Sequence, residues 1–149
     1  WWYWLRAWRS SAGMLLTPGA ALQPVMSLQS QVFATRTLQP GQPLGYGAHF
    51  VASHTTRVGL VAVGYADGYL RALSNQGADV LIQGQRCPVL GRVTMDQLVV
   101  NVSHLETLPI AGDEVVLLGT QGSAEITATE LAAKAGTIPW EIFTAIKAR

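Results

Sequence analysis

The stretch RVGLVAVGY (residues 57–65) decides the fold class of this chain. It is a short apolar run rich in β-branched valine, which is typical of a strand buried on both faces. Further strands are predicted along the chain, each separated from the next by a turn. The first of these strands ends at a proline- and glycine-rich turn at residues 39–43. They are residues 26–38, a hairpin over residues 79–93 joined at Gly84-Gln85, residues 96–102, and residues 114–118 followed by a turn at residues 119–122.

Only the end of the chain is predicted to be helical. Thr127 followed by Glu130 is a capping-box pattern, and Gly136 ends the Ala-rich segment that comes after it. A second helix is expected to start near Thr137, with Pro139 in its first turn. The side chains expected on its buried face are Ile138, Ile142, Ala145 and Ile146. About five to seven strands before such a tail predict a mainly β domain, barrel- or sandwich-like, with a short C-terminal helical tail.

Composition narrows the class of protein. The chain has 149 residues, 49% of them hydrophobic and 13% charged, which suits one folded domain and excludes wholesale disorder. A net charge of +1 without a basic cluster argues against a nucleic-acid surface. No apolar run reaches the roughly 18 residues of a membrane helix, so no membrane partner is expected. The single cysteine, Cys87, cannot form an internal disulfide and is predicted to be buried and inert.

Two segments are distinguished along the chain. Residues 1–22 form an irregular aromatic leader, interpreted as a junction cut from a preceding domain, and residues 23–149 form the β domain. The leader lacks helical or strand periodicity, and its arginines follow its apolar part, the wrong order for a secretory signal. A cytoplasmic location is therefore the default expectation. Four tryptophans lie in this leader: Trp1, Trp2, Trp4 and Trp8.

Two tyrosines lie beside glycines, Tyr46 in GYG (residues 45–47) and Tyr65 in GYADGY (residues 64–69). Glycine lets the backbone turn sharply or approach another group closely, so either phenol could stand at the mouth of a site. A phenol with a pKa near 10 needs cationic or hydrogen-bonding help to act as a base at neutral pH. The alternative is a tyrosine at a strand end whose ring packs against the protein and whose hydroxyl is exposed to solvent.

The segment GRVTMD (residues 91–96) joins one strand to the next. Its backbone N–H groups could bind a carboxylate with Arg92 nearby, or it could be an ordinary connection with Asp96 as a turn residue. Asp67 is likewise expected to serve turn chemistry. No metal site is predicted, because the histidines are scattered without ligand spacing. They are His49, His54 and His104.

These motifs together resemble a known family. GYGA (residues 45–48), VGYADGYLR (residues 63–71) and GRVTMD (residues 91–96) match the C-terminal domain of alanine racemase in order and separation. The similarity includes PVMSL (residues 24–28) and AGTIP (residues 135–139), and it runs from about Gly13 to the end of the chain.

The resemblance implies a pyridoxal-phosphate enzyme that interconverts L- and D-alanine, usually as a homodimer. In that family an N-terminal barrel holds the cofactor through a lysine, and the C-terminal β domain of the partner subunit completes the site. The cofactor is an electron sink, and racemisation needs one base on each face of the planar intermediate. The roles implied here are Tyr46 as the second base, Met95 N–H as the carboxylate donor, Tyr65 at the inner entrance, Arg71 and Arg92 along the outer corridor, and Asp96 in support.

Two departures from the family pattern affect this interpretation. Trp140 stands where many members carry a tyrosine that bonds the cofactor phosphate, which suggests a reshaped pocket and a broader amino-acid specificity. The only lysines, Lys134 and Lys147, fall in the helical tail, so the chain carries half of a site and is expected to be inactive alone. The alternatives are a catalytically silent fragment and a stand-alone β module that serves binding or assembly.

Overall fold

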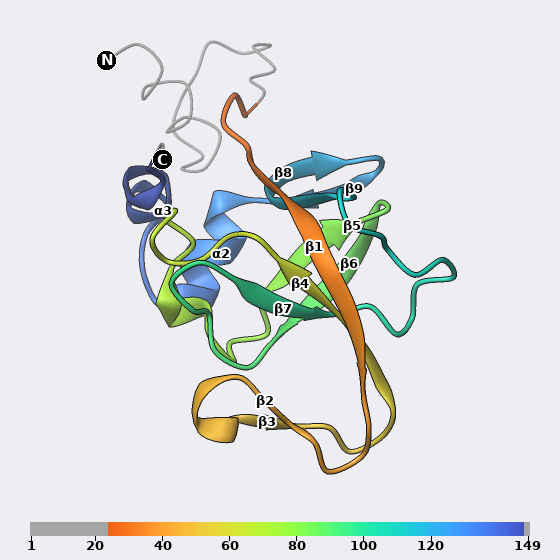
Figure 1. Cartoon of the computed structure of the whole chain (residues 1–149). Coiled ribbons are helices and arrows are strands. Elements are labelled where there is room, and N and C mark those ends of the chain that lie inside the picture. The colour runs from red at the N-terminus through yellow and green to blue at the C-terminus, as the bar shows by residue number, and fades with distance from the viewer. Residues whose placement is uncertain (1–23, 148–149) are drawn as a thin grey trace, which may run out of the picture.

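The computed structural model describes residues 24–147 of the chain, and of Tyr46 only the backbone. Within this range nine strands precede two α-helices (Figure 1). The strands are β1 Leu28–Leu38, β2 Pro43–Leu44, β3 Phe50–Val51, β4 Thr56–Val61, β5 Asp79–Ile82, β6 Gln85–Leu90, β7 Leu98–Asn101, β8 Glu114–Gln121 and β9 Ala124–Ile126. The helices are α2 Ala128–Ala135 and α3 Pro139–Ala145, with short 3-10 helices η1 Tyr46–Ala48 and η2 Arg71–Leu73.

Six strands close into a barrel. Their order is β1-β4-β7-β6-β5-β8, all neighbours are antiparallel, and β8 pairs back with β1. The long strand β1 closes the ring because residues 28–31 pair with β8 while residues 32–38 pair with β4. The register shifts between Val32 and Ala34, where the strand passes from one partner to the other. The predicted mainly β fold with a helical tail is confirmed.

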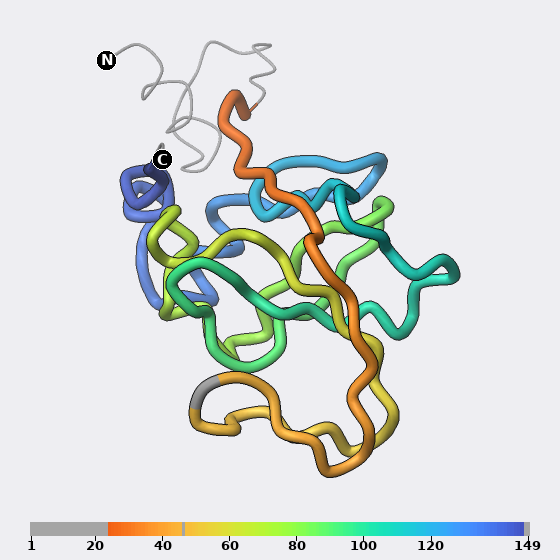
Figure 2. The backbone as a smooth tube through the Cα atoms, viewed as in Figure 1, coloured from red at the N-terminus to blue at the C-terminus, as the bar shows by residue number. Residues whose placement is uncertain are grey.

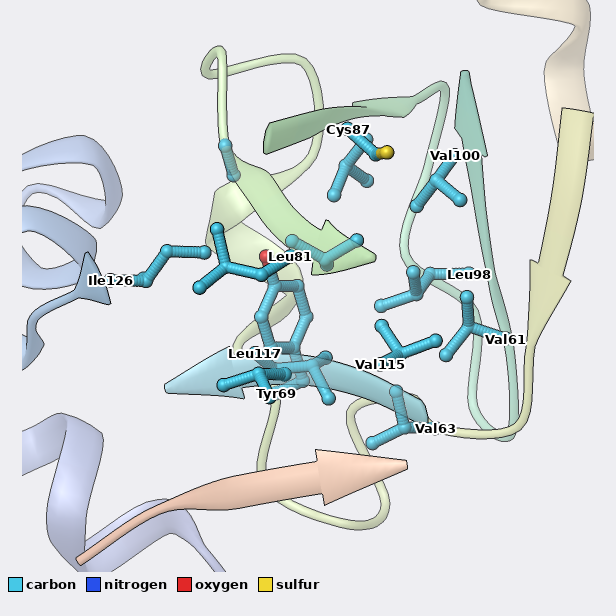
Figure 3. Close-up of a cluster of buried hydrophobic side chains, with 14 of the residues drawn as sticks. Val61, Val63, Tyr69, Leu81, Cys87, Leu98, Val100, Val115, Leu117 and Ile126 are labelled. Carbon is cyan, nitrogen blue, oxygen red and sulfur yellow. The ribbon is translucent and has the colours of Figure 1, made fainter. Parts of the chain in front are cut away.

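The main core fills the inside of this barrel. Side chains from β4, β5, β7 and β8 meet there, and Val61, Leu81, Val100 and Val115 are each 0% exposed. The ring of one buried aromatic side chain, Tyr69, lies among them (Figure 3). Strand β4 has no exposed residue, as predicted for a strand buried on both faces. Packing in this core therefore fixes the positions of the strand ends that carry the sequence motifs.

A smaller core supports the β2–β3 hairpin outside the barrel. It consists of the buried residues Leu38, Leu44, Ala52 and Val58, with Phe50, Leu90 and Val99 packed against them. Figure 2 shows the chain running along β1 from the end of the domain where α3 lies to this hairpin at the other end. The hairpin is therefore an arm that projects from the barrel on its own apolar support.

The helical tail begins and ends as predicted. The Thr127 hydroxyl accepts a hydrogen bond from the Glu130 N–H at 3.1 Å, and Gly136 ends α2 in the left-handed conformation at φ 69°. The Glu130 carboxylate binds basic side chains, so no return bond to Thr127 completes the capping box. The prediction that Ile138 is buried is wrong, because it is the extended N-cap of α3 and is 54% exposed.

Other details differ from the predictions. The strands β2 and β3 were not predicted, because their two-residue length leaves no alternating pattern to detect. The turn predicted at residues 119–122 starts later, at residues 122–123, since β8 continues to Gln121 and Gly119 holds a positive φ of 120° within the strand. The leader, residues 1–22, lies outside the described residues. Over residues 24–147, no helix is long and apolar enough to cross a membrane.

Candidate active half-site

Tyr46 lies at the tip of the β2–β3 hairpin, in η1. The glycines on either side, Gly45 and Gly47, have φ values of 68° and 77°, which L side chains rarely adopt. The predicted sharp turn at these glycines is therefore confirmed. Leu44, directly before the turn, is 3% exposed in the small core. The local sequence thus places the Tyr46 backbone on a tight loop whose base is fixed by apolar packing.

A second loop, residues 64–69, follows the barrel strand β4 and carries Tyr65. The Asp67 carboxylate accepts a hydrogen bond from the Gly64 N–H at 2.9 Å, so Asp67 serves turn chemistry as predicted. The Tyr69 N–H donates to the Gly64 carbonyl at 3.2 Å, and the Tyr69 side chain, 2% exposed, is anchored in the core. Tyr65 itself is 46% exposed. The loop therefore exposes the Tyr65 side chain, while the buried Tyr69 side chain anchors the loop to the barrel.

The third loop, residues 91–97, lies directly against the second. The Tyr65 N–H donates to the Thr94 carbonyl at 3.0 Å, and the Ala66 N–H donates to the Met95 carbonyl at 3.1 Å. A Cβ at Gly64 would lie only 2.3 Å from both carbonyl oxygens, so only glycine permits this approach. Tyr65 and Met95, which are separated by a hairpin in the sequence, are thus neighbours in the structure.

The 91–97 loop is itself closed by its own hydrogen bonds. The Thr94 hydroxyl donates to the Gln97 carbonyl at 2.8 Å, and the Thr94 N–H donates to the same oxygen at 3.1 Å. Met95 at the tip is 51% exposed, and among residues 24–147 the structure shows no partner for its N–H. Asp96 is exposed beside it. A backbone N–H of this kind can donate a hydrogen bond to a carboxylate oxygen of a ligand.

The two arginines of the sequence motifs converge on one open pocket. Arg71 of η2 and Arg92 line it together with His49, Ser74 and Asn75. The Ser74 hydroxyl accepts from the Val93 N–H at 3.0 Å, which ties η2 to the 91–97 loop. The ion pairs that the structure shows among its described residues all lie elsewhere, between Arg86 or Lys134 and two carboxylates. The pocket is therefore a region of net positive charge that favours anions.

Sequence reasoning missed the position of His49. It is exposed, as expected of a surface histidine, but it lines the same pocket as the arginines. Its Nε2 lies 2.9 Å, and Arg92 Nη1 3.9 Å, from the place a Cβ would take on Gly47. The cationic side chain of Arg92 therefore lies beside η1, the segment that carries Tyr46. The only signal in the sequence is that His49 follows Tyr46 by three positions.

Trp140 lies on α3, apart from these three loops in the chain but on the same side of the barrel. Its half-buried ring packs against Phe143 with the ring centroids 6.4 Å apart. The other end of α3 passes over the 64–69 loop at Gly68. In Figure 1 the segments from α3 down to the β2–β3 hairpin follow one side of the domain. The helix therefore connects Trp140 to the loop that carries Tyr65.

The remaining titratable groups are structural. Cys87 is buried as predicted, and burial raises the pKa of its thiol to about 12, which keeps the thiol protonated at neutral pH. The Arg86 guanidinium binds both Glu130 oxygens, at 2.7 and 2.8 Å, and lowers the pKa of that carboxyl to about 2. No group of three or more metal-ligating side chains is found in the part of the chain that the structure describes.

Known proteins with similar sequences and structures identify the family of this chain. Residues 25–149 match the family model described as alanine racemase, C-terminal domain. The chain belongs to this family. An alanine racemase from Syntrophobacter fumaroxidans is 45% identical over 127 residues, covering 85% of this chain and 33% of the relative. A catabolic alanine racemase from Pseudomonas putida is 48% identical over 128 residues, covering 86% of this chain and 34% of the relative.

Solved structures agree with the family assignment. Alanine racemase from Bacillus anthracis with bound L-Ala-P superimposes with a TM-score of 0.79 at 37% identity, over 89% of this chain and 35% of the other. The enzyme from Bartonella henselae with covalently bound pyridoxal phosphate gives a TM-score of 0.80 at 30% identity, with the same coverage. The chain thus spans about a third of the length of these alanine racemases.

Proposed function

We propose that this chain is the domain that completes the active site of a pyridoxal-phosphate-dependent alanine racemase, which interconverts L- and D-alanine. The observation that carries the proposal is the convergence of the two loops carrying Tyr65 and Met95, joined by two backbone hydrogen bonds and the close contact at Gly64. Such a rigid arrangement exposes a phenol and an unpartnered N–H side by side. It is the kind of pre-organised surface that substrate binding requires.

Tyr46 is the group that moves the proton. Racemisation of an amino acid needs a base on each face of the α-carbon, and the Tyr46 hydroxyl takes the α-proton of the L-isomer. A phenol does this at neutral pH only when a nearby cation favours its ionised form. Arg92, whose Nη1 lies 3.9 Å from the Cβ position at Gly47, places a cation beside η1.

The other predicted residues bind and guide the substrate. The Met95 N–H holds the alanine carboxylate, Tyr65 narrows the inner entrance beside it, and Asp96 supports the loop. Arg71 and Arg92 line the outer corridor, where their positive charge attracts a carboxylate substrate. These residues lie in the 64–69 and 91–97 loops, apart from Arg71, which lies in η2.

Pyridoxal phosphate, when bound, would take up the electron pair left on the α-carbon after proton removal. The described residues would contact the cofactor from one side only. Trp140 offers an indole N–H to the phosphate, while Lys134 is held by Glu130 at 2.8 Å and by Asp79 at 3.4 Å. The lysine and the barrel that hold the cofactor would therefore come from the partner subunit of a homodimer.

The test is exchange of the α-proton of L-alanine in D₂O with added pyridoxal phosphate. The chain is measured alone and then mixed with a separately expressed barrel domain of a family racemase. We expect exchange only in the mixture, its loss in Tyr46→Phe, and its retention in the matched control Tyr69→Phe, whose ring is buried in the core.

Two results would contradict the proposal. Equal loss of exchange from L- and D-alanine in Tyr46→Phe would reject Tyr46 as the base specific to one face. Absence of exchange above free cofactor in both samples would favour a catalytically silent binding or assembly module.

A further inference from the structure

The backbone that follows α3 presses on the loop that carries Tyr65. At Gly68 a Cβ would lie 2.3 Å from the Ala145 carbonyl oxygen and 2.4 Å from the Ile146 Cα. One residue further, the Lys147 N–H donates a hydrogen bond to the Asp67 carbonyl at 3.2 Å. Residues 145–147, called the strap below, therefore contact the loop through backbone atoms at two successive positions.

The contact continues through the loop to its far side. The Asp67 residue that accepts from the strap also accepts, through its carboxylate, from the Gly64 N–H at 2.9 Å. Gly64 in turn lies against the carbonyl groups of Thr94 and Met95. Three backbone layers are thus stacked in order: the strap, the 64–69 loop and the 91–97 loop. A shift of the strap would therefore act directly on the 64–69 loop and, through Gly64, on the 91–97 loop.

The strap is fixed at its other side by the helical tail. The buried Ile142 and the partly buried Ile146 pack in the main core with Leu28, Leu118 and Leu131, which joins α3 to α2 and the barrel. The Thr144 hydroxyl donates to the Trp140 carbonyl at 2.9 Å, within the same helix. The α3 helix therefore connects Trp140 at its start to the strap at its end as one short rigid body.

We propose that the strap is a positioning element of the half-site, which sets the place of Tyr65 and the Met95 N–H relative to Trp140. The catalytic meaning of this inference rests on the proposed function. Its structural content does not, because the three-layer stack is present in this chain whatever reaction it serves.

The test compares Gly68→Ala with Gly112→Ala in the 149-residue chain. The two glycines have nearly equal φ, 105° and 100°, but nothing lies within 4 Å of a Cβ at Gly112. The difference between the variants therefore isolates the collision with the strap from backbone strain. The readout is hydrogen exchange of the Tyr65 and Ala66 amides, with the Val89 amide, bonded to the Ala78 carbonyl at 2.8 Å, as the reference for global unfolding.

We expect the protection of Tyr65 and Ala66 to fall about tenfold more in Gly68→Ala than in Gly112→Ala, relative to Val89. Truncation after Thr144 removes the strap and supplies a second measurement. It should lower the same protection in the unsubstituted chain, and Gly68→Ala should add no more than Gly112→Ala in the truncated background.

Equal protection in Gly68→Ala and Gly112→Ala, or no effect of the truncation, would overturn the inference whatever the enzyme does. In the enzyme reassembled with a barrel domain, kcat/KM for L-alanine should fall about tenfold in Gly68→Ala relative to Gly112→Ala. Equal kinetics would overturn the positioning role. Failure of the proposed function would appear separately, in Tyr46→Phe, which leaves residues 145–147 unsubstituted.

Discussion

Replacing Gly64 with alanine tests the close contact between the 64–69 loop and the 91–97 loop. The new Cβ would lie 2.3 Å from the Thr94 and Met95 carbonyl oxygens, whereas an ordinary contact begins at 3.4 Å. The two backbones must therefore separate by about 1 Å, the difference between these distances. Such a shift breaks the hydrogen bonds from the Tyr65 and Ala66 N–H groups, worth about 1 kcal/mol each. With overpacking added, we expect a loss of about 3 kcal/mol in the free energy of unfolding.

The matched control is Gly59→Ala in β4. Neither Gly59 nor Gly64 has a positive φ, and a Cβ at Gly59 meets only two valine methyl groups, at 3.4 and 3.5 Å. We expect this variant to stay within about 1 kcal/mol of the unsubstituted chain. Urea unfolding followed by circular dichroism measures both. The reasoning is refuted if the two variants have the same free energy of unfolding.

Two further predictions concern the core and the ion pairs. Tyr69→Phe should leave the free energy of unfolding in urea unchanged or raise it by about 1 kcal/mol. The reason is that the buried Tyr69 hydroxyl has no hydrogen-bond partner among the described residues. A clear loss of stability would show that the hydroxyl is hydrogen-bonded. Arg86 lowers the folded-state pKa of Glu130 from 4.5 to about 2, so its stabilising effect is complete above pH 4.5 and lost as the pH falls toward 2. Urea midpoints measured across this range should fall less in Glu130→Gln than in the unsubstituted chain, and parallel curves would contradict the assignment.

Most of the barrel could be predicted from the sequence because its strands bury one or both faces. Burial is indicated by the valine-rich run before Gly64 and by the alternation of apolar residues at Leu98 and Val100. The two-residue strands of the hairpin arm are too short to show any period. The exposure of Ile138 was mispredicted because the helical pattern was continued onto the N-cap residue, where the backbone is extended.

The candidate site divides in the same way. The sequence alone determined which segments matter, since three motifs in register indicate the family, and it determined the tight turns at Gly45 and Gly47. Only the tertiary structure decided why Gly64 and Gly68 must lack a side chain, because the atoms that approach them belong to segments distant in the chain. It also brought His49 to the arginine pocket. Local conformation is encoded by neighbouring residues, whereas close contacts between loops depend on how the closed barrel places its strand ends.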